Sequence, residues 1–301
     1  MNESYRHDVA AAMHLRLALA SRPACLPKGT KVTCESNYTL ETIKPILAVF
    51  WWLNKYLGGR TPSQFLLSDH SSNRAPDFDK MCAGPLEDLK AYVSKHQQNA
   101  HLDYQNEATF LLFDQAYFYR NFLKCLLAAH CIQDSFPDIQ DTQTVVDVGC
   151  GVGTFAIACQ LMHTFPRAQF VLSDQYELQC DLATKLFSAL QLRSFTVRQA
   201  NAFQQFGRRG LRIASYWLCG NRRGVVERSN DELRQVLRDG MILIDYERNI
   251  EDFSKRIDFL QPRLLPLKIT APVSPEVARF VGSRDLTVHV LGVDAAHSYP
   301  K

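Results

Sequence analysis

The chain has 301 residues, and at about 150 residues per domain this length indicates two units or one domain with a large extension. A hydrophobic fraction of 46% and a charged fraction of 22% argue against collagen-like, coiled-coil and wholly disordered classes. The 34 lysines and arginines nearly balance the 31 aspartates and glutamates, so the net charge of +3 neither indicates nor excludes a nucleic-acid binder.

The nine cysteines show no pattern that would pair them or make them metal ligands. Their number is odd, and no two have C-x-x-C spacing, so we expect reduced, mostly buried thiols rather than disulfides or a structural zinc site. The amino-terminal residues lack the apolar core of a secretory signal. The longest apolar run, residues 46–53, is far shorter than the ~20 residues that cross a membrane. We therefore expect a soluble, cytoplasmic protein with no metal and no membrane contact.

The amino-terminal half is predicted to be mainly helical. Residues 1–20 have a helix-like pattern, 40–57 are apolar and end at two glycines, and 86–95 are again helix-like. The intervening residues 61–85 are rich in Ser, Asp, Asn and Pro, which is typical of a loop. A long helix with many aromatic residues is predicted over 107–131. It is apolar on more than one face, so we expect it to be buried between the sheet described next and the rest of this half.

From residue 143 onward, strand-like runs alternate with helix-like stretches, which is typical of a parallel, doubly wound sheet. The predicted strands are 144–148, 169–172, 195–197, 211–218, 241–244, 265–270 and 286–291. The predicted helices are 154–163, 176–192, 227–238 and 251–260. Because no full helix separates the last two strands, we expect them to form a terminal antiparallel hairpin.

A glycine-rich loop joins the first of these strands to the helix that follows it. Gly149, Gly151 and Gly153 allow the backbone to turn tightly and to approach a ligand where a Cβ atom would clash. The start of the helix offers unpaired N–H groups to a polar or anionic ligand. Asp147 precedes the loop, and Asp174 closes the next strand, where its carboxylate can bind two ribose hydroxyls. Asp174 also precedes a helix, so a helix-capping role without any ligand is the alternative.

The loop departs from the dinucleotide-binding fingerprint G-x-G-x-x-G, because Thr154 stands where the third glycine should be. Its spacing, D-x-G-x-G-x-G, resembles motif I of the class I S-adenosylmethionine-dependent methyltransferases, and the resemblance covers about residues 143–293. It implies a Rossmann-like α/β fold with a doubly wound, seven-stranded, mostly parallel sheet of order 3-2-1-4-5-7-6. It also implies S-adenosylmethionine as the cofactor.

The resemblance further implies which residues bind that cofactor. The glycine loop lines its methionine part, Asp147 orders the loop or reaches the amino group, and Asp174 holds the ribose. After the third strand, Asn201 stands where the family has an acid that contacts the adenine amine, and it keeps an acceptor oxygen. Phe203 follows and is equally a candidate for the core. The expected cofactor-binding set is Asp147, Gly149, Cys150, Gly151, Gly153, Asp174, Gln175, Asn201, Ala202 and Trp217.

The end of the fourth strand, residues 215–224, lies where many family members place their catalytic motif. It matches neither the [DNS]-P-P-[YFW] motif of base amino-methyltransferases nor the Pro-Cys motif of cytosine C5 methyltransferases. Cys219 lacks the preceding proline, so a buried structural thiol is favoured over a nucleophile. Asn221 and Arg222 are candidate substrate contacts, since a guanidinium suits carboxylate or phosphate, and a solvated loop is the alternative.

Direct methyl transfer needs a base only for a weak oxygen or a protonated nitrogen nucleophile. The candidate bases are Asp245, Glu247 and His101. Many family members cover the cofactor with amino-terminal helices that supply aromatic and arginine side chains. The expected substrate contacts from this part of the chain are therefore Tyr104, Tyr117 and Arg120, with core packing as the alternative for Tyr117.

The sequence thus predicts three parts: a mainly helical cap over 1–103, an aromatic helix over 104–142 that packs on the core, and a cofactor-binding core over 143–301. We expect a methyltransferase that acts by direct displacement on an oxygen or nitrogen of a small-molecule acceptor, because the charge is balanced and no RNA-binding module is visible. An RNA methyltransferase that uses the arginine-bearing loops is one alternative. A non-catalytic partner protein that keeps the fold is another.

Overall fold

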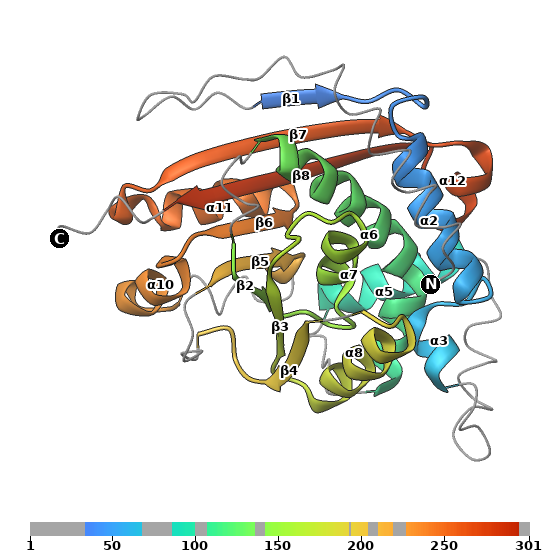
Figure 1. Cartoon of the computed structure of the whole chain (residues 1–301), viewed down its shortest axis with the longest axis horizontal. Helices are drawn as coiled ribbons and strands as arrows, with labels where there is room; N and C mark the ends of the chain where they lie inside the picture. The colour runs from blue at the N-terminus through green and yellow to red at the C-terminus, as the bar shows by residue number, and fades with distance from the viewer. Residues whose placement is uncertain are drawn as a thin grey trace.

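The computed structural model describes residues 34–67, 86–99, 107–135, 142–192, 194–203, 210–218 and 227–294. Its centre is an eight-stranded sheet of order β1-β7-β8-β6-β5-β2-β3-β4 (Figure 1). The strands are β1 (Cys34–Asn37), β2 (Thr144–Val148), β3 (Gln169–Asp174), β4 (Phe195–Gln199), β5 (Leu211–Ser215), β6 (Met241–Asp245), β7 (Arg263–Pro272) and β8 (Asp285–Asp294). Neighbouring strands are parallel except β8, which runs antiparallel to both β6 and β7.

If β2, the strand before the glycine loop, is numbered 1 and β8 is numbered 7, these strands follow the order 3-2-1-4-5-7-6 in the sheet. The antiparallel strand is number 7, which is β8. The predicted fold class and strand order are therefore confirmed. Strand β1 is the difference, because the amino-terminal region adds a strand to the sheet edge as well as helices. It pairs with β7, with Cys34 opposite Leu267 and Asn37 opposite Thr270. Such a short strand forms by pairing with the exposed edge of β7, and four residues are too few for an alternation to be read from sequence.

The predicted antiparallel pairing of the last two strands is confirmed, although the connection between β7 and β8 contains a short helix. This helix is α12 (Pro275–Val281), and the Ser274 side chain accepts a hydrogen bond from the N–H of Val277 at its start. The other helices are α2 (Lys44–Tyr56), α3 (Pro62–Leu67), α5 (Leu86–Asn99), α6 (Glu107–Ser135), α7 (Thr154–Leu161), α8 (Glu177–Ala189), α10 (Asn230–Leu237) and α11 (Glu247–Arg256), with a 3-10 turn at Asp258–Leu260.

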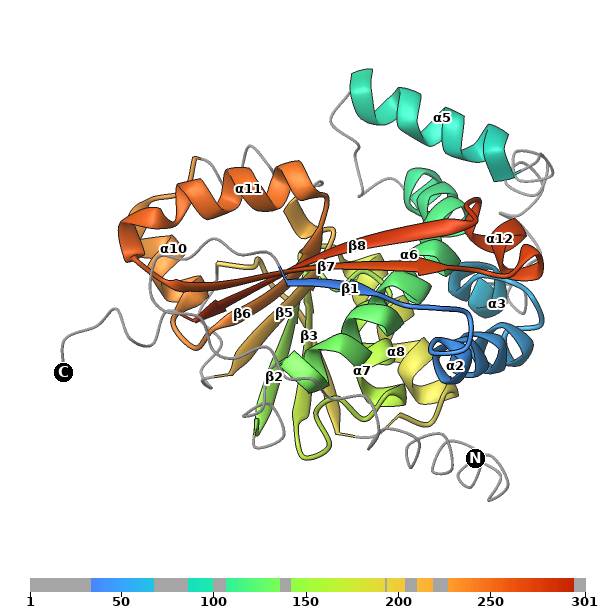
Figure 2. The same cartoon turned by 90° about the horizontal axis from the view of Figure 1, so that it is seen from above.

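Helices cover both faces of the sheet, with α10 and α11 on one side and α6 and α7 on the other (Figure 2). The side chains of β2 pack alternately against the helices on the two faces of the sheet, because successive side chains of a strand point to opposite faces. Val145 belongs to the larger core cluster, which includes residues of α6 and α7, while Val146 and Val148 belong to the cluster that contains α10 and α11 residues. The central strands β2, β3 and β6 are thus buried on both faces, as strands of a parallel sheet covered by helices are.

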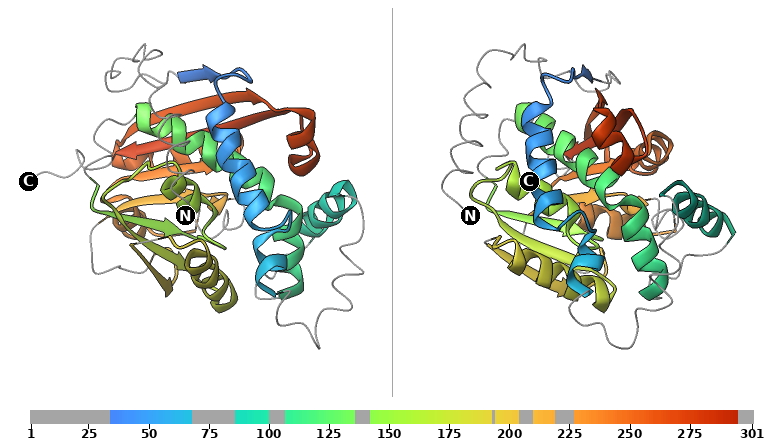
Figure 3. Two further views of the ribbon diagram at one scale, coloured as in Figure 1. Left: turned by 45° about the vertical axis from the view of Figure 1, so that its right-hand side comes forward. Right: turned by 90° about the vertical axis from the view of Figure 1, so that its right-hand side faces the viewer.

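Helix α6 is the longest helix of the described chain, with 29 residues. It packs against α7 on the sheet and against α2, which lies alongside it (Figure 3). The stretch from Phe122 to Ala129 is buried at every position, which explains why the helix is apolar on more than one face. No helix within the described ranges combines the length and the apolar character that a membrane crossing requires.

Candidate functional site

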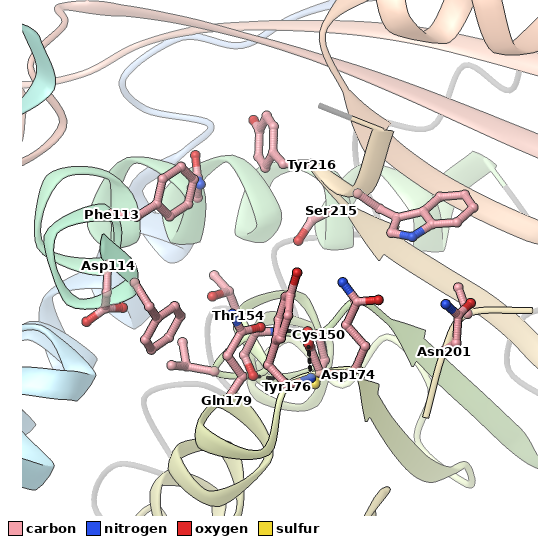
Figure 4. A pocket seen from close by; sticks show the side chains of 18 of the residues that line it. Phe113, Asp114, Cys150, Thr154, Asp174, Tyr176, Gln179, Asn201, Ser215 and Tyr216 are labelled. Carbon is pink, nitrogen blue, oxygen red and sulfur yellow. Dashed lines mark hydrogen bonds between the residues drawn. The ribbon is translucent and has the colours of Figure 1, made fainter. Parts of the chain in front are cut away.

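A cavity of about 230 Å³ lies at the carboxyl ends of the central parallel strands (Figure 4). Its wall is built by residues 149–152 of the glycine loop, 174–176 after β3, 200–203 after β4 and 215–217 after β5, together with one face of α6. In doubly wound sheets this edge, where the strand order reverses, forms the ligand crevice. The topology therefore brings four separate segments of the chain to one place.

Two glycines of the loop serve different purposes. Gly151 has a φ of +56° and lines the cavity, and a Cβ atom built on it would meet no atom within 4 Å. Gly153 has a φ of +81°, and a Cβ atom there would lie 2.5 Å from Cε2 of Phe187 on α8. Both positions favour glycine because their backbone is left-handed. Gly151 leaves space toward the cavity, whereas Gly153 permits close packing of α7 on α8.

Asp147 lies beneath the loop and outside the cavity wall. It is 1% exposed, and its Oδ2 accepts a hydrogen bond from the N–H of Ala156 at 3.2 Å, while its Oδ1 has no hydrogen-bond partner among the described residues. Burial raises the pKa of Asp147 to about 8, and the nearby Asp174 carboxylate adds to the increase. This position ties α7 to the end of β2 and fits the loop-ordering role better than direct contact with a ligand.

Asp174 lines the cavity and links β3 to the glycine loop. Its Oδ2 accepts from the N–H of Gly151 at 3.0 Å, and its Oδ1 accepts from the N–H of Tyr176 at 3.1 Å. With its amide nitrogen turned toward the carboxylate, Gln179 of α8 donates to both oxygens at 3.0 and 2.8 Å. Burial raises the pKa of Asp174 to about 6, and the backbone N–H donors oppose the increase. The carboxylate is therefore well supplied with donors before any ligand is considered.

The segment after β4 meets the segment after β5 on the other side of the cavity. The Oδ1 of Asn201 accepts from the N–H of Phe203 at 3.0 Å, which fixes the turn. The ring of Phe203 lies 5.8 Å from the Trp217 ring and 4.5 Å from the Arg228 guanidinium. Arg228 also pairs with Glu232 at 2.9 Å. Phe203 thus lines the cavity and packs against neighbouring side chains, and Arg228 is a cavity residue that the sequence analysis did not identify.

The carboxyl end of β5 differs from its prediction. The strand was expected to run to residue 218, but it ends at Ser215, because Tyr216 has a φ of +56° and leaves the extended conformation. The N–H of Tyr216 donates to the carbonyl of Ile244 at 2.7 Å, and its ring contacts that of Tyr246 at 5.6 Å between centroids. This turn brings both Tyr216 and Trp217 into the cavity wall.

Helix α6 supplies the remaining wall. Its lining residues are Phe110, Phe113, Asp114, Phe118 and Asn121. The Asp114 carboxylate accepts from the N–H of Ser63 at 3.1 Å and from the Ser63 hydroxyl, and burial raises its pKa. The helical spacing of this face was visible in the sequence, but apolar residues on the other faces hid which side was functional.

The two α6 residues expected to contact substrate point elsewhere. Tyr117 lies 5.0 Å from Phe113, ring to ring, and its hydroxyl is 3.3 Å from that of Ser94 on α5. Arg120 donates to the carbonyl of Val281 at the end of α12, at 3.2 Å. Neither residue belongs to the cavity wall. Of the other expected contacts, Tyr104, Asn221 and Arg222 lie outside the described residues.

The candidate bases after β6 do not line the cavity either. Asp245 is 2% exposed and accepts hydrogen bonds from the N–H groups of Leu218 and Tyr246, at 2.9 and 2.8 Å, and from the amide of Asn249 at 2.7 Å. These bonds give it a structural role between the end of β5 and the start of α11. Glu247 is an exposed residue at the start of α11.

The third candidate base, His101, lies outside the described residues. Within the described ranges, no group of three or more His, Cys, Asp or Glu side chains has the arrangement of a metal site. The groups that line the cavity include aromatic rings, side-chain amides, the carboxylates of Asp114 and Asp174 and the guanidinium of Arg228.

No family model matches the sequence, and no relative was found among curated proteins. Among solved structures, the chain is similar to the plantazolicin methyltransferase BpumL in complex with SAH, with 13% identity, coverage of 68% of this chain and 98% of that one, and a TM-score of 0.45. It is also similar to the mitomycin 7-O-methyltransferase MmcR, with 13% identity, coverage of 72% and 69%, and a TM-score of 0.44. Magnesium protoporphyrin IX methyltransferase from Synechocystis PCC 6803 with bound SAM has 14% identity, coverage of 66% and 96%, and a TM-score of 0.40.

Proposed function

We propose that the protein is an S-adenosylmethionine-dependent methyltransferase that transfers the methyl group to an oxygen or nitrogen of a small-molecule acceptor. The observation that carries the proposal is the meeting of the glycine loop, Asp174 and the ends of β4 and β5 around one cavity. The strand order, including the antiparallel strand β8, agrees with the family that motif I resembles. In this arrangement the loop and the ribose-binding acid come from adjacent parallel strands.

The residues of the cavity fit this cofactor in space and in chemistry. The open side of Gly151 leaves room for its methionine part beside Gly149 and Cys150. Asp174 is the acceptor for ribose hydroxyls, and the ring of Trp217 offers an apolar face for the adenine. The proposed adenine and ribose contacts also include Gln175, Asn201 and Ala202. When bound, the cofactor supplies a methyl group on a sulfonium, and the protein aligns the nucleophile and excludes water.

Gln179 competes with a ribose for the carboxylate of Asp174. Its amide faces the carboxylate that would bind the hydroxyls, and it lines the same cavity. A carboxylate offers about four lone-pair sites, and two backbone N–H groups and the Gln179 amide occupy them. We therefore infer that ribose hydroxyls replace the Gln179 amide on Asp174 when the cofactor binds.

The acceptor end of the cavity supports a small molecule over RNA. Phe110, Phe113 and Phe118 of α6 give it aromatic walls. Apolar walls with few polar groups are typical of small-molecule sites, whereas RNA binding relies on basic surfaces that contact phosphates. If the acceptor is a small molecule, RNA binding should be weak and should show no steep loss between low and physiological salt. Tight, salt-sensitive RNA binding would instead favour the RNA methyltransferase alternative.

Calorimetry with S-adenosylmethionine tests the proposal directly. The wild type should bind with measurable heat, and Gly151→Arg should lose it because the new side chain enters the cavity. The matched control is Gly59→Arg, in the turn after α2, where φ is +75° and a Cβ atom also meets nothing within 4 Å. This control should bind like the wild type. Absence of heat in the wild type would refute both enzyme alternatives, and equal heat in Gly151→Arg would refute the placement of the loop. NAD in the same cell should give no heat.

A further inference from the structure

Asp114 is a buried acid in the aromatic wall of the cavity. It is 5% exposed, and aspartate is almost never so buried unless it is paired. Within the described part of the chain, no lysine, arginine or histidine forms an ion pair with it. Its neighbours are neutral donors instead, the N–H and the hydroxyl of Ser63 and the hydroxyl of Thr61. The negative charge of Asp114 is therefore solvated by α3 and its flank but not neutralised.

The position of Asp114 on α6 places it within the face that lines the cavity. Phe110 lies four residues before it and Phe118 four residues after it, so the three side chains share one side of the helix. Asn121, three residues further on, continues the same line. Because Asp114 itself belongs to the cavity wall, a ligand that packs along this face of α6 contacts it directly.

The carboxylate of Asp114 has room for a further donor. A carboxylate offers about four lone-pair sites. Both donors of Ser63 reach Oδ2, and the single proton of the Thr61 hydroxyl takes one more site, so at least one site remains for a ligand. Burial raises the pKa of Asp114, and the donors of Ser63 and Thr61 oppose the increase by stabilising the ionised form. A cation beside the carboxylate would stabilise that form further and offset the cost of burying an unpaired charge.

The protein does not supply this cation from the cavity wall. Among the described residues that line the cavity, Arg228 is the only cation, and its guanidinium lies over the ring of Phe203, which follows β4. Figure 4 shows Asp114 beside Phe113 at one end of the cavity and Asn201, which also follows β4, at the other. The end of the cavity at α6 therefore combines a negative charge with aromatic faces, and both attract a cation.

We propose that Asp114 binds an ammonium group of the methyl acceptor, and that the acceptor is a small aromatic molecule with a positively charged amine. The inference rests on the proposed function and adds the chemical class of the acceptor. The phenylalanines of α6 contact the apolar body, and the carboxylate of Asp114 fixes the charged end. A nitrogen that keeps its proton has no free electron pair, so the amine bound to Asp114 is a recognition group. The atom that accepts the methyl group is a different oxygen or nitrogen of the same molecule.

The test compares three probes of nearly equal shape that differ in the charge of one end. They are tyramine, which ends in an ammonium, 4-propylphenol, which ends in a methyl group, and 3-(4-hydroxyphenyl)propanoate, which ends in a carboxylate. Their affinities are measured by calorimetry at pH 7 with wild-type protein saturated with S-adenosylhomocysteine. Tyramine should bind about tenfold more tightly than 4-propylphenol, because hydrogen bonds between charged groups are the strong ones. The propanoate should bind most weakly, since its charge repels that of Asp114.

The variant Asp114→Asn connects this preference to the residue. It removes the charge and keeps an acceptor oxygen for Ser63, so it should bind tyramine no more tightly than 4-propylphenol and leave the affinity for 4-propylphenol unchanged. Asp181→Asn, at an exposed position of α8, is the matched control and should keep the wild-type preference. The ranking of the three probes in the wild type tests the proposal even if Asp114→Asn does not fold. Equal binding of tyramine and 4-propylphenol by the wild type, or an unchanged preference in Asp114→Asn, would overturn the assignment.

Calorimetry with S-adenosylhomocysteine alone separates the two levels of inference. This molecule carries an ammonium of its own, and its affinity should be the same in the wild type and in Asp114→Asn. Weaker binding of S-adenosylhomocysteine by Asp114→Asn with an unchanged preference for tyramine would assign Asp114 to the cofactor and overturn the proposal. Heat with the wild type but no preference among the probes would overturn the Asp114 assignment and leave the proposed function standing. Absence of heat would overturn the proposed function itself.

Discussion

At the scale of single residues, the carboxyl group of Asp147 makes stability depend on pH. It is buried beneath the glycine loop with one donor, the N–H of Ala156, and its pKa is raised from 3.8 to about 8. Between these two values the folded state keeps a proton that the unfolded state has released. The contribution of this group to stability is therefore full below about pH 4 and is lost progressively up to about pH 8.

The variant Asp147→Asn should remove this dependence, because the amide keeps an acceptor for Ala156 and cannot ionise. We expect its free energy of unfolding to match that of the wild type near pH 4 and to exceed it by on the order of a few kcal/mol at pH 8. Urea denaturation at several pH values measures the difference. Asp181→Asn, at an exposed position of α8, is the control and should keep the wild-type profile. Identical profiles for Asp147→Asn and the wild type would contradict the prediction.

The two loop glycines allow a second residue-scale prediction. Gly153→Ala combines a left-handed backbone with a Cβ atom 2.5 Å from Phe187, and we expect it to cost about 2–4 kcal/mol of stability. Gly151→Ala has the same backbone problem in open space and should cost only ~1–2 kcal/mol. The midpoints of denaturant-induced unfolding of the two variants and the wild type measure the two losses of stability. Equal losses would show that packing against Phe187 does not distinguish the two positions.

At the scale of elements, alternation and loop chemistry predicted the parallel strands, because a buried strand next to a glycine turn leaves a local signal. Their order in the sheet was implied by the resemblance of the glycine loop to motif I of the methyltransferases. What could not be predicted depends on distant partners. Strand β1 exists by pairing with β7, more than 200 residues away in the chain. The face of α6 that lines the cavity could not be identified from the sequence, because other faces of the helix are apolar too. Phe122 and its neighbours are apolar because they pack against α7 and α2 and not because they line the cavity. The sequence therefore favours Tyr117 and Arg120 as substrate contacts, whereas the structure has Asn121 in the cavity wall.

Asp114 is the residue of this face that joins α6 to α3, which gives an element-scale prediction. Its buried carboxylate accepts from the N–H and the hydroxyl of Ser63. Ser63→Ala should therefore destabilise the protein by about 1–3 kcal/mol, because a buried acceptor loses a donor. In an Asp114→Asn background the same change should cost less, and a double-mutant cycle by urea denaturation measures the difference. Ser94→Ala on α5 is the control and should be additive with Asp114→Asn. Additivity for Ser63 as well would contradict the proposed connection.

At the scale of the whole molecule, the length left two arrangements open, two units or one extended unit. The larger core cluster crosses every boundary that the sequence suggested. It contains Phe50 of α2, Phe122 of α6, Phe155 of α7 and Val288 of β8 in one continuous set of buried residues. The sheet likewise runs without a break from β1 to β4. Shared buried contacts of this kind make segments unfold together, because exposing one of them leaves the others without their packing partners.

The three tryptophans allow this cooperativity to be measured, since Trp51 and Trp52 lie on α2 and Trp217 follows β5. In the double variant Trp51→Phe, Trp52→Phe, fluorescence reports only on the central sheet. In Trp217→Phe it reports only on α2. For each variant we expect the fluorescence midpoint in urea to coincide with the midpoint from far-ultraviolet circular dichroism, because coincident transitions are the signature of all-or-none unfolding. A midpoint for α2 clearly below that of circular dichroism would show that the amino-terminal helices unfold independently of the sheet, and that the shared core does not couple them.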